Sequence, residues 1–414
     1  MDILEKRDKE IFDLIQKEEK RQFESIRLIP SENYVSKAVL EATGSCLTNK
    51  YSEGFAGKRY YEGQEFIDQI ENLACKRAQD LFKTDYIPNV QPYSGSPANL
   101  IALLSLCNLG DTIMGMHLAH GGHLTHGWKA SFTGKLFNSV QYTVSKETNL
   151  IDFEEIREVA IQSKPKVIIC GYTAYPREVN FKKFKEIADE VGAFLIADTS
   201  HITGLISSGI HQSPFGFADI VTSTSHKTLR GPRGAFIMSK TEEIAKKVEK
   251  TVIPGLQGGP HNHTTAAMAV AFAEANTENF RNYSNQIVKN AKKLAEELIN
   301  KGFNLVTGGT DNHLILIDTI KSKNIIGKDA SLALAKSGII CNANTVPFDT
   351  RSPMSPSGIR IGTPAITTLG LKEEDMVIIA EFMNKILENY NNDELLLKIR
   401  EEVRSFILKF KLDI

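Results

Sequence analysis

The amino-acid sequence predicts an α/β protein with a large domain built on a mostly parallel sheet and a smaller C-terminal α/β domain. Between residues 80 and 240, short apolar runs alternate with amphipathic helical patterns, which is typical of parallel strands connected by helices. The apolar runs are unbroken, as expected for strands buried on both faces of a sheet. The 414 residues are 42% hydrophobic and 24% charged, so the chain can form a large core and two domains.

The elements of the large domain can be placed in order along the chain. Residues 1–22 are charged and amphipathic, and we expect a helix there and no signal peptide. Strands are expected over the apolar runs 112–116, 166–171, 193–198, 219–223 and 234–239. Helices are expected between them, over residues 96–108, 151–162 and 181–191. The glycine- and histidine-rich stretches at 117–127 and 254–263 are expected to form loops.

The smaller domain is expected to begin near residue 280. Residues 261–300 are alanine-rich and then charged and periodic, which indicates one long helix or two abutting ones. Further on we expect a strand over 314–320 and helices over 328–337, 372–391 and 393–409. We therefore divide the chain into residues 1–280, with the N-terminal segment and the large domain, and residues 281–414.

Charge and cysteine content exclude several classes of protein. The chain has 49 basic and 50 acidic residues, so no overall field attracts nucleic acid or an anionic membrane. No apolar run reaches the roughly 18 residues of a membrane-spanning helix. The five cysteines are scattered without a C-x-x-C pair, which indicates neither a zinc site nor a disulfide framework. A reduced, cytoplasmic setting fits best.

The stretch TSTSHKTLRGPRGA (222–235) contains a lysine with no carboxylate nearby. Lys227 would follow one expected strand, and the strand before it ends on Asp198. Ligands of open parallel sheets bind at the carboxyl ends of strands, so one ligand could contact both side chains. Pyridoxal 5′-phosphate needs a lysine that forms a Schiff base and a carboxylate at its pyridine nitrogen. An isolated aspartate at a strand end could equally well cap a turn.

Two further stretches could contact such a cofactor. Residues 94–96, Ser-Gly-Ser, lead into a helix whose free N–H groups and dipole favour an anion, although such a motif is more often a plain N-cap. The loop 117–127 contains four histidines, and a metal site is the obvious alternative there. Because residues 112–146 include no acidic side chain, stacking of an imidazole on a planar cofactor is the favoured interpretation.

Two stretches could contact a substrate. Residues 50–63 combine four aromatic residues with three cations, and they form either a surface loop or a clamp that places Glu53 as an acid/base. Arg360 lies between apolar neighbours in an expected short strand within 357–365. It needs an anionic partner or a route to water, and a substrate carboxylate would satisfy it through two parallel hydrogen bonds.

Taken together, these stretches resemble serine hydroxymethyltransferase. The matching segments, all in family order between about residues 25 and 390, are SENY (31–34), NKYSEGFAGKRYY (49–61), LAHGGHLTHG (118–127), SHKTLRGPRG (225–234), NANTVP (342–347) and SGIRIGTPAIT (357–367). The resemblance implies a fold-type I pyridoxal-phosphate enzyme with a seven-stranded sheet that forms a homodimer or a tetramer. It also implies interconversion of serine and glycine through an external aldimine, with transfer of the hydroxymethyl carbon to tetrahydrofolate to give 5,10-methylenetetrahydrofolate.

The resemblance also implies roles for individual residues. The implied catalytic residues are Lys227, which carries the cofactor, with Asp198 at the pyridine nitrogen, His123 stacked on the ring, Glu53 as proton shuttle, and Tyr61. The implied cofactor contacts also include Ser94, Gly95, Ser96, Thr173, His201, Thr224 and His226, with Gly258 and Gly259 across the dimer. The implied substrate contacts are Ser31 and Arg360, with Tyr51, Glu53 and Tyr61 across the dimer. The implied folate contacts are Glu53, Tyr60, Leu118, Gly121, Gly122, Leu124 and Asn344, and no metal is implied.

The chain departs from the family pattern at several positions that bear on folate and substrate range. Pro97 replaces a common glutamine, Thr173 a serine, Leu256 a glycine and Phe348 a polar residue. The alternative enzyme is a paralogue on the same scaffold, either a folate-independent β-hydroxy-amino-acid aldolase or an α-methylserine hydroxymethyltransferase. Outside enzymes, the alternative is a cofactor-binding regulator without catalysis.

Overall fold

The computed structural model describes residues 2–410, and residues 1 and 411–414, at the outer ends of the two expected domains, lie outside the described residues. The chain folds into two compact units. The large unit comprises residues 33–288 and 310–313, and the small unit comprises, among the described residues, 2–32, 289–309 and 314–410. The domain boundary near residue 280 stays a prediction.

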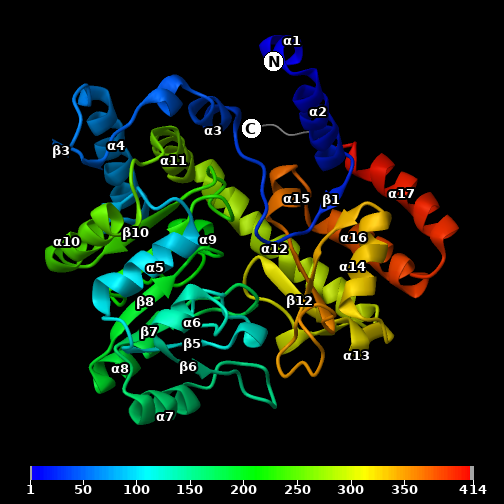
Figure 1. Cartoon of the computed structure of the whole chain (residues 1–414). Coiled ribbons are helices and arrows are strands. Elements are labelled where there is room, and N and C mark those ends of the chain that lie inside the picture. The colour runs from blue at the N-terminus through cyan, green and yellow to red at the C-terminus, as the bar shows by residue number, and fades with distance from the viewer. Residues whose placement is uncertain (1, 411–414) are drawn as a thin grey trace. The chain divides into compact units, whose positions relative to one another are not determined.

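A seven-stranded sheet forms the centre of the large unit (Figure 1). Its strands, in spatial order, are β4 (Ile87–Asn89), β10 (Ala235–Ser239), β9 (Ile220–Thr224), β8 (Phe194–Asp198), β7 (Val167–Cys170), β5 (Thr112–Met116) and β6 (Asn138–Tyr142). The pairs from β9 to β6 are parallel, and β10 is antiparallel to both of its neighbours. The prediction of a mostly parallel, seven-stranded sheet is therefore confirmed.

Helices cover both faces of this sheet because successive strand residues point to opposite sides. In β8, for example, Leu195 belongs to one apolar core and Ile196 to the other. The Ile196 side packs against α5 (Gly95–Leu106) and α10 (Glu242–Lys250). The Leu195 side packs against α4 (Glu65–Phe82), α7 (Phe153–Ser163), α8 (Phe181–Val191) and α11 (Asn262–Ala275).

Sequence patterns placed the central strands well and the edge strands poorly, and they did not predict the helix α4 (Glu65–Phe82). Strands β4 and β6 were not predicted, because both are partly exposed and lack an unbroken apolar run. The loop predicted over 254–263 is wrong at both ends, since it begins inside the π-helical turn η3 (Thr251–Leu256) and ends inside α11. The alanine-rich stretch forms two helices, α11 and α12 (Glu278–Asn300).

The small unit contains an antiparallel sheet in the order β11 (Asn304–Leu305), β12 (Leu314–Asp318), β15 (Gly358–Gly362) and β14 (Asn342–Asn344). Its helices include α1 (Asp2–Arg7), α2 (Lys9–Phe23), α13 (Thr319–Lys323), α14 (Gly327–Lys336), α15 (Pro364–Thr368), α16 (Glu373–Glu388) and α17 (Asp393–Ile407). A short parallel pair, β1 (Ile26–Arg27) with β13 (Ile339–Ile340), joins the N-terminal segment to this unit. These elements confirm the predicted smaller α/β part.

Short elements complete the described chain. In the large unit these are α3 (Lys37–Thr43), η1 (Cys46–Asn49), β2 (Gly54–Phe55), β3 (Lys58–Arg59), η2 (Leu118–His120), α6 (Phe132–Leu136) and α9 (Thr203–Ser207). In the small unit the remaining element is η4 (Val306–Gly308). Over residues 2–410, no helix combines the length and the apolar character that crossing a membrane requires.

Candidate active site

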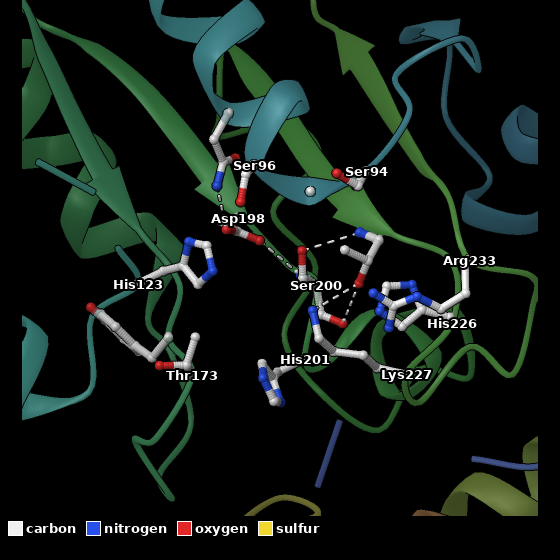
Figure 2. A pocket seen from close by; sticks show the side chains of 14 residues that line it. Ser94, Ser96, His123, Thr173, Asp198, Ser200, His201, His226, Lys227 and Arg233 are labelled. Carbon is white, nitrogen blue, oxygen red and sulfur yellow. Dashed lines mark hydrogen bonds between the residues drawn. The ribbon is translucent and has the colours of Figure 1, made fainter. Parts of the chain in front are cut away.

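A pocket of about 180 Å³ lies in the large unit where the strands β7, β8 and β9 end and α5 begins. Such an edge, at the carboxyl ends of parallel strands, is where open α/β sheets bind ligands. Ten of the predicted cofactor residues line it: Ser94, Gly95, Ser96, His123, Thr173, Asp198, His201, Thr224, His226 and Lys227. Asn99, Tyr172, Ser200 and Arg233 complete the lining (Figure 2).

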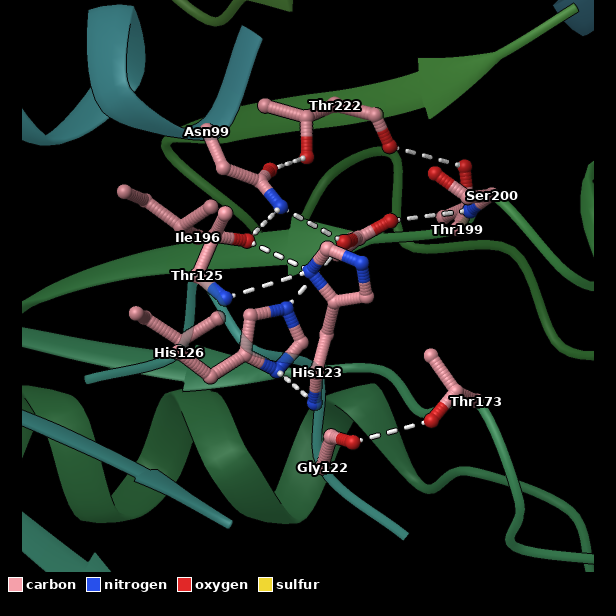
Figure 3. A network of polar contacts seen from close by, with 12 residues as sticks. Asn99, Gly122, His123, Thr125, His126, Thr173, Ile196, Thr199, Ser200 and Thr222 are labelled. Carbon is pink, nitrogen blue, oxygen red and sulfur yellow. Dashed lines mark hydrogen bonds and ion pairs between the residues drawn. The ribbon is translucent and has the colours of Figure 1, made fainter. Parts of the chain in front are cut away.

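Asp198 is the anion of the pocket (Figure 2), and its carboxylate accepts hydrogen bonds from Asn99, Ser200 and His126, which are labelled in Figure 3. Asn99 Nδ2 lies 2.8 Å from Oδ2, the backbone nitrogen of Ser200 lies 3.0 Å from Oδ1, and His126 Nε2 lies 3.1 Å from Oδ2. Burial alone would raise the pKa of Asp198, but the hydrogen bond from His126 and neighbouring positive charges outweigh it and lower that pKa well below its usual range. Asp198 is therefore ionised and can pair with a protonated ring nitrogen.

The two histidines beside Asp198 are fixed by backbone donors. The backbone N–H of His123 donates to His126 Nδ1 at 3.3 Å, so the proton of His126 lies on Nε2, toward Asp198. The backbone N–H of Thr125 donates to His123 Nδ1 at 3.2 Å, and His123 lines the pocket. Both imidazoles are thus held in one orientation.

The same groups give the metal alternative a concrete form. Ligand atoms of His123, His126 and Asp198 lie within 4.8 Å of one another and could hold an ion. A metal at His126 Nε2 would have to displace the proton that this nitrogen shares with Asp198. The hydrogen bond between His126 and Asp198 therefore favours an organic ligand at this carboxylate, with the histidines as its supports.

The opposite end of the pocket is built for an anion. Ser94 precedes α5 as its N-cap without using its hydroxyl for capping, and the first N–H groups of the helix point to the pocket edge. A Cβ on Gly95 would lie 2.7 Å from Thr224 Cγ2, so only glycine leaves this approach open. Pro97 removes one N–H from the first turn, which leaves Gly95 and Ser96 as its backbone donors.

His226 adds a donor or acceptor to the same end. Its Nδ1 is buried and has no hydrogen-bond partner among residues 2–410. Burial, and then the charges of Lys227 and Arg233, lower the pKa of His226 to about 3. A buried polar atom of this kind is expected to be satisfied by a ligand, and the two cations beside it favour a phosphate.

Lys227 lines the same pocket (Figure 2). Its Nζ donates to Thr224 Oγ1 at 2.9 Å, and its backbone carbonyl accepts a hydrogen bond from Asn33 Nδ2 at 3.0 Å. Asn33 Nδ2 also donates to Tyr283 Oη at 2.8 Å, and the guanidinium of Arg230 lies 4.9 Å above that tyrosine ring. The pocket thus offers a carboxylate, an amine and an anion cradle, which is the donor set that pyridoxal 5′-phosphate requires.

A second cluster in the large unit gathers predicted residues that do not line this pocket. Tyr51 Oη donates to Glu53 Oε1 at 3.1 Å, and Tyr61 Oη donates to Glu53 Oε2 at 3.5 Å. Gly258 and Gly259 lie against them, since a Cβ there would come within 3.0 Å of Glu53 and 3.1 Å of Tyr51. Tyr51 and Tyr61 are 55% and 45% exposed, so the cluster is open to solvent in the single chain.

The predicted folate residues of the large unit lie mainly on the loop 117–127. Thr173 ties this loop to the end of β7, because its Oγ1 donates to the carbonyls of Gly121 at 3.2 Å and Gly122 at 2.9 Å. The side chains of Leu124 and Tyr60 are 44% and 70% exposed. Leu118 opens the short helix η2 in the same loop.

Three predicted residues, Ser31, Asn344 and Arg360, belong to the small unit. Arg360 lies in the middle of β15, and its Nε donates to Asn342 Oδ1 at 3.2 Å. Burial lowers the pKa of Arg360 to about 10, so a carboxylate ligand would offset the cost of desolvating this cation. Asn344 Nδ2 donates to the carbonyl of Thr345 at 2.7 Å.

Comparison with known proteins shows the family. The family model for serine hydroxymethyltransferase matches residues 4–383. The chain belongs to the serine hydroxymethyltransferase family. Serine hydroxymethyltransferase of Desulfotalea psychrophila is 57% identical over 99% of this chain and 96% of the relative. That of Methanosarcina barkeri is 54% identical over 99% of each chain, and that of Acidothermus cellulolyticus 60% identical over 92% of this chain and 88% of the relative.

Within this serine hydroxymethyltransferase family member, sequence reasoning missed the residues that support Asp198. Asn99 was one available signal, because a buried amide in the apolar helix ANLIALL is unusual unless it binds something. It donates to Thr125 Oγ1 as well as to Asp198, and it accepts from Thr222 Oγ1 at 2.6 Å. Ser200 offered no signal, because its backbone N–H makes the contact.

Proposed function

We propose that the chain interconverts serine and glycine and transfers the hydroxymethyl carbon to tetrahydrofolate, giving 5,10-methylenetetrahydrofolate. The observation that carries this proposal is that Asp198, Lys227 and the N-terminus of α5 line one pocket of a serine hydroxymethyltransferase family member. The family is one of pyridoxal-phosphate-dependent transferases with tetrahydrofolate as co-substrate, so the predicted enzyme class and cofactors are confirmed.

The residues of the pocket fit pyridoxal 5′-phosphate. Lys227 would bind it covalently, Asp198 would contact the ring nitrogen, and the α5 N-terminus with His226 would bind its phosphate. His123 would lie against one face of the ring. Bound there, the cofactor supplies an electron sink for the charge released when the Cα–Cβ bond of serine breaks.

The remaining site residues would bind and orient the amino acid. Arg360 and Ser31 would bind its carboxylate, since a bidentate guanidinium pair fixes direction as well as position. Glu53 would accept and return the proton of the substrate hydroxyl oxygen. Tyr51 and Tyr61, which donate to the two oxygens of Glu53, would hold that carboxylate in place.

Folate would bind where exposed aromatic and apolar side chains meet polar backbone. The residues proposed for this role are Glu53, Tyr60, Leu118, Gly121, Gly122, Leu124 and Asn344. The exposed side chains of Tyr60 and Leu124 support it, because a planar ligand would cover apolar surface that now faces water.

We further propose a homodimer, or a tetramer of two such dimers, in which Tyr51, Glu53 and Tyr61 serve the pocket of the partner subunit together with Gly258 and Gly259. The solvent exposure of the two tyrosines and their place outside the lining of their own pocket support this arrangement. All five cysteines are free thiols, which supports a cytoplasmic location.

A second candidate function is that of a paralogue, an aldolase or an α-methylserine hydroxymethyltransferase. Phe348 is the observation that favours it, since this side chain is 41% exposed on the segment after Asn344 and is apolar where the family pattern is polar. A changed folate segment would matter less to an enzyme that cleaves hydroxy amino acids without folate.

One spectroscopic experiment separates these functions. The cofactor-loaded protein is mixed with glycine and then with tetrahydrofolate while its visible absorbance is followed. A strong red-shifted band that requires both compounds is expected for the transferase. Cleavage of allo-threonine or α-methylserine with no response to folate would favour the paralogue, and a protein that never acquires cofactor absorbance would contradict both.

A further inference from the structure

One buried arginine anchors the hairpin that carries Glu53. Strands β2 and β3 form this hairpin, and Arg59 at its end has a side chain only 3% exposed. Arg59 Nη1 donates to the backbone carbonyls of Ser52 at 3.0 Å and Gly54 at 2.7 Å. These are the two residues that flank Glu53, so the backbone of Glu53 is fixed on both sides by one guanidinium.

Two carboxylates of helix α4 fix the same guanidinium. Arg59 Nε donates to Asp68 Oδ1 and Nη2 donates to Glu71 Oε2, each at 2.9 Å. The other oxygens of these carboxylates accept backbone N–H groups from the turn of the hairpin, Gly57 at 2.8 Å and Ala56 at 3.1 Å. Four N–H groups of the guanidinium and all four oxygens of the two carboxylates are therefore hydrogen-bonded, which stabilises a buried ion cluster.

A further side chain, from the segment between β4 and α5, completes the cluster. Gln91 Nε2 donates to the carbonyl of Gly54 and to Glu71 Oε2, both at 2.9 Å. Gly54 itself has a φ of +96°, and a Cβ there would lie 2.3 Å from the carbonyl of Lys58. Contacts with α4 and with the segment that leads to α5 thus fix the backbone conformation next to Glu53.

We propose that Arg59 is a positioning residue that sets the aim of the Glu53 carboxylate, an inference that rests on the proposed function of Glu53 at the substrate hydroxyl. Only an arginine can do this, because its planar fork reaches two carbonyls and two carboxylates at once, whereas a lysine offers one point charge. A displacement of about 1 Å in a proton-transfer group can cost on the order of a hundredfold in rate.

The test compares Arg59→Lys, Glu53→Gln and the double variant, all as cofactor-loaded proteins. Arg59→Lys should lower kcat for the folate-dependent conversion of serine about tenfold to a hundredfold, with little change in the KM for serine. It should leave exchange of the glycine α-proton nearly unchanged, since that step involves no hydroxyl. When Glu53 is already replaced by glutamine, adding Arg59→Lys should lower kcat by less than about threefold, because a residue that acts through Glu53 then has no carboxylate to position.

A readout independent of turnover separates positioning from general damage. Amide hydrogen exchange of residues 52–60 should accelerate in Arg59→Lys, while the rest of the chain keeps its protection. Arg157→Lys is the matched control, because it makes the same replacement in an exposed bidentate arginine–carboxylate pair with Glu190 away from the pocket lining. Its kinetics and exchange should equal those of the wild type.

Two results would overturn the inference in a wild type that is active with serine and folate. One is an equal loss of serine conversion and glycine exchange, and the other is a loss that simply adds to that of Glu53→Gln. If Arg59→Lys does not fold, Asp68→Asn is the second variant, since this carboxylate is 24% exposed. Asp68→Asn should lower kcat for serine conversion about threefold to tenfold and leave exchange of the glycine α-proton nearly unchanged. An equal loss in both reactions would contradict the inference as well. A wild type without folate-dependent conversion would instead refute the proposed function.

Discussion

At the scale of single residues, the charge of Asp198 is the most demanding feature of the pocket. A buried carboxylate ordinarily takes up a proton, because the charged form loses its hydration. Here the side chain of Asn99, the backbone N–H of Ser200 and the ring of His126 replace that hydration. Three hydrogen-bond donors thus stabilise the ionised form of the Asp198 carboxylate. We expect this of a carboxylate whose function is to bind a positively charged partner.

Replacing Asp198 with asparagine keeps the shape of the side chain and removes its charge. Because the pyridine nitrogen would then lose its ionic partner, we expect Asp198→Asn to lower kcat by about a hundredfold to a thousandfold. Steady-state kinetics with serine and tetrahydrofolate, after equal cofactor loading has been verified by absorbance, measure the effect. Asp80→Asn is the control, since Asp80 is an exposed aspartate of α4 paired with Lys76. A variant with near wild-type kcat would show that the charge of Asp198 has no part in turnover.

At the scale of elements, the segment between β14 and β15 links two predicted binding residues, Asn344 and Arg360. Asp349 closes this segment on itself, since Oδ2 accepts from the backbone N–H of Ser357 at 2.9 Å and of Val346 at 3.4 Å. Its Oδ1 accepts from Ser357 Oγ at 2.8 Å and from the N–H of Arg351 at 2.9 Å. Burial would raise the pKa of Asp349, but these hydrogen bonds outweigh it and the net pKa is lowered.

We expect Asp349→Asn to weaken folate binding selectively. An amide can replace only some of these hydrogen bonds, and a lost bond to a charged group costs about 1.5–3 kcal/mol. The KM for tetrahydrofolate should rise about tenfold or more, while glycine binding in the absence of folate changes little. Asp393→Asn, which breaks an exposed pair with Lys336 in the same unit, is the control. An equal rise in the dissociation constant of glycine would indicate that the whole β14–β15 region has loosened.

The same scale shows what the sequence could predict. An unbroken apolar run predicts a central strand, and so β8 and its terminal Asp198 were placed correctly from AFLIAD. The edge strand NSVQY has no such run, because one side of an edge strand meets water. The cluster around Arg59 was also out of reach, since its partners Asp68, Glu71 and Gln91 come together only through the packing of α4 against the hairpin. Local patterns predict which groups are buried, and the fold decides which groups meet.

At the scale of the whole molecule, buried histidines make stability depend on pH. His120 is 6% exposed, and its Nδ1 accepts a hydrogen bond from the N–H of Val144, which requires the neutral ring. Burial, and then the charge of His117, lower the pKa of His120 to about 4, below the ordinary 6.5. Between pH 4 and pH 6.5 the ring of His120 is protonated in the unfolded chain and neutral in the folded chain. The contribution of His120 to the free energy of unfolding is therefore complete above pH 6.5 and is lost as the pH falls.

We therefore expect the cofactor-free protein to lose up to about 2 kcal/mol from His120 between pH 6.5 and pH 5. His120→Asn lacks the titrating group, so its midpoint of thermal unfolding should fall less than that of the wild type when the pH is lowered from 7.5 to 5. Calorimetry at both values measures the difference. Identical shifts in the two proteins would mean that other groups account for the acid sensitivity.

The proposal that Glu53 of one subunit acts in the pocket of the other can be tested by combining two inactive chains. Lys227→Ala removes the cofactor anchor and Glu53→Gln removes the proton-transfer group, so each variant alone should be nearly inactive. In a dimer with one chain of each kind, one pocket pairs the intact Lys227 of the Glu53→Gln chain with the intact Glu53 of the Lys227→Ala chain, provided that Glu53 acts across the interface. Such a dimer should recover about half of the wild-type activity, because one of its two symmetry-related sites is complete.

Heterodimers for this experiment are obtained by co-expressing the two variants with different tags and purifying on both. Mixed dimers of Lys227→Ala with wild type give the reference activity, since they too contain one complete site of two. If Glu53 instead served the pocket of its own chain, neither pocket of the doubly variant dimer would be complete and activity would stay at the level of the parents. The open position of Tyr51 and Tyr61, 55% and 45% exposed in the single chain, favours the first result, because a dimer interface would cover them.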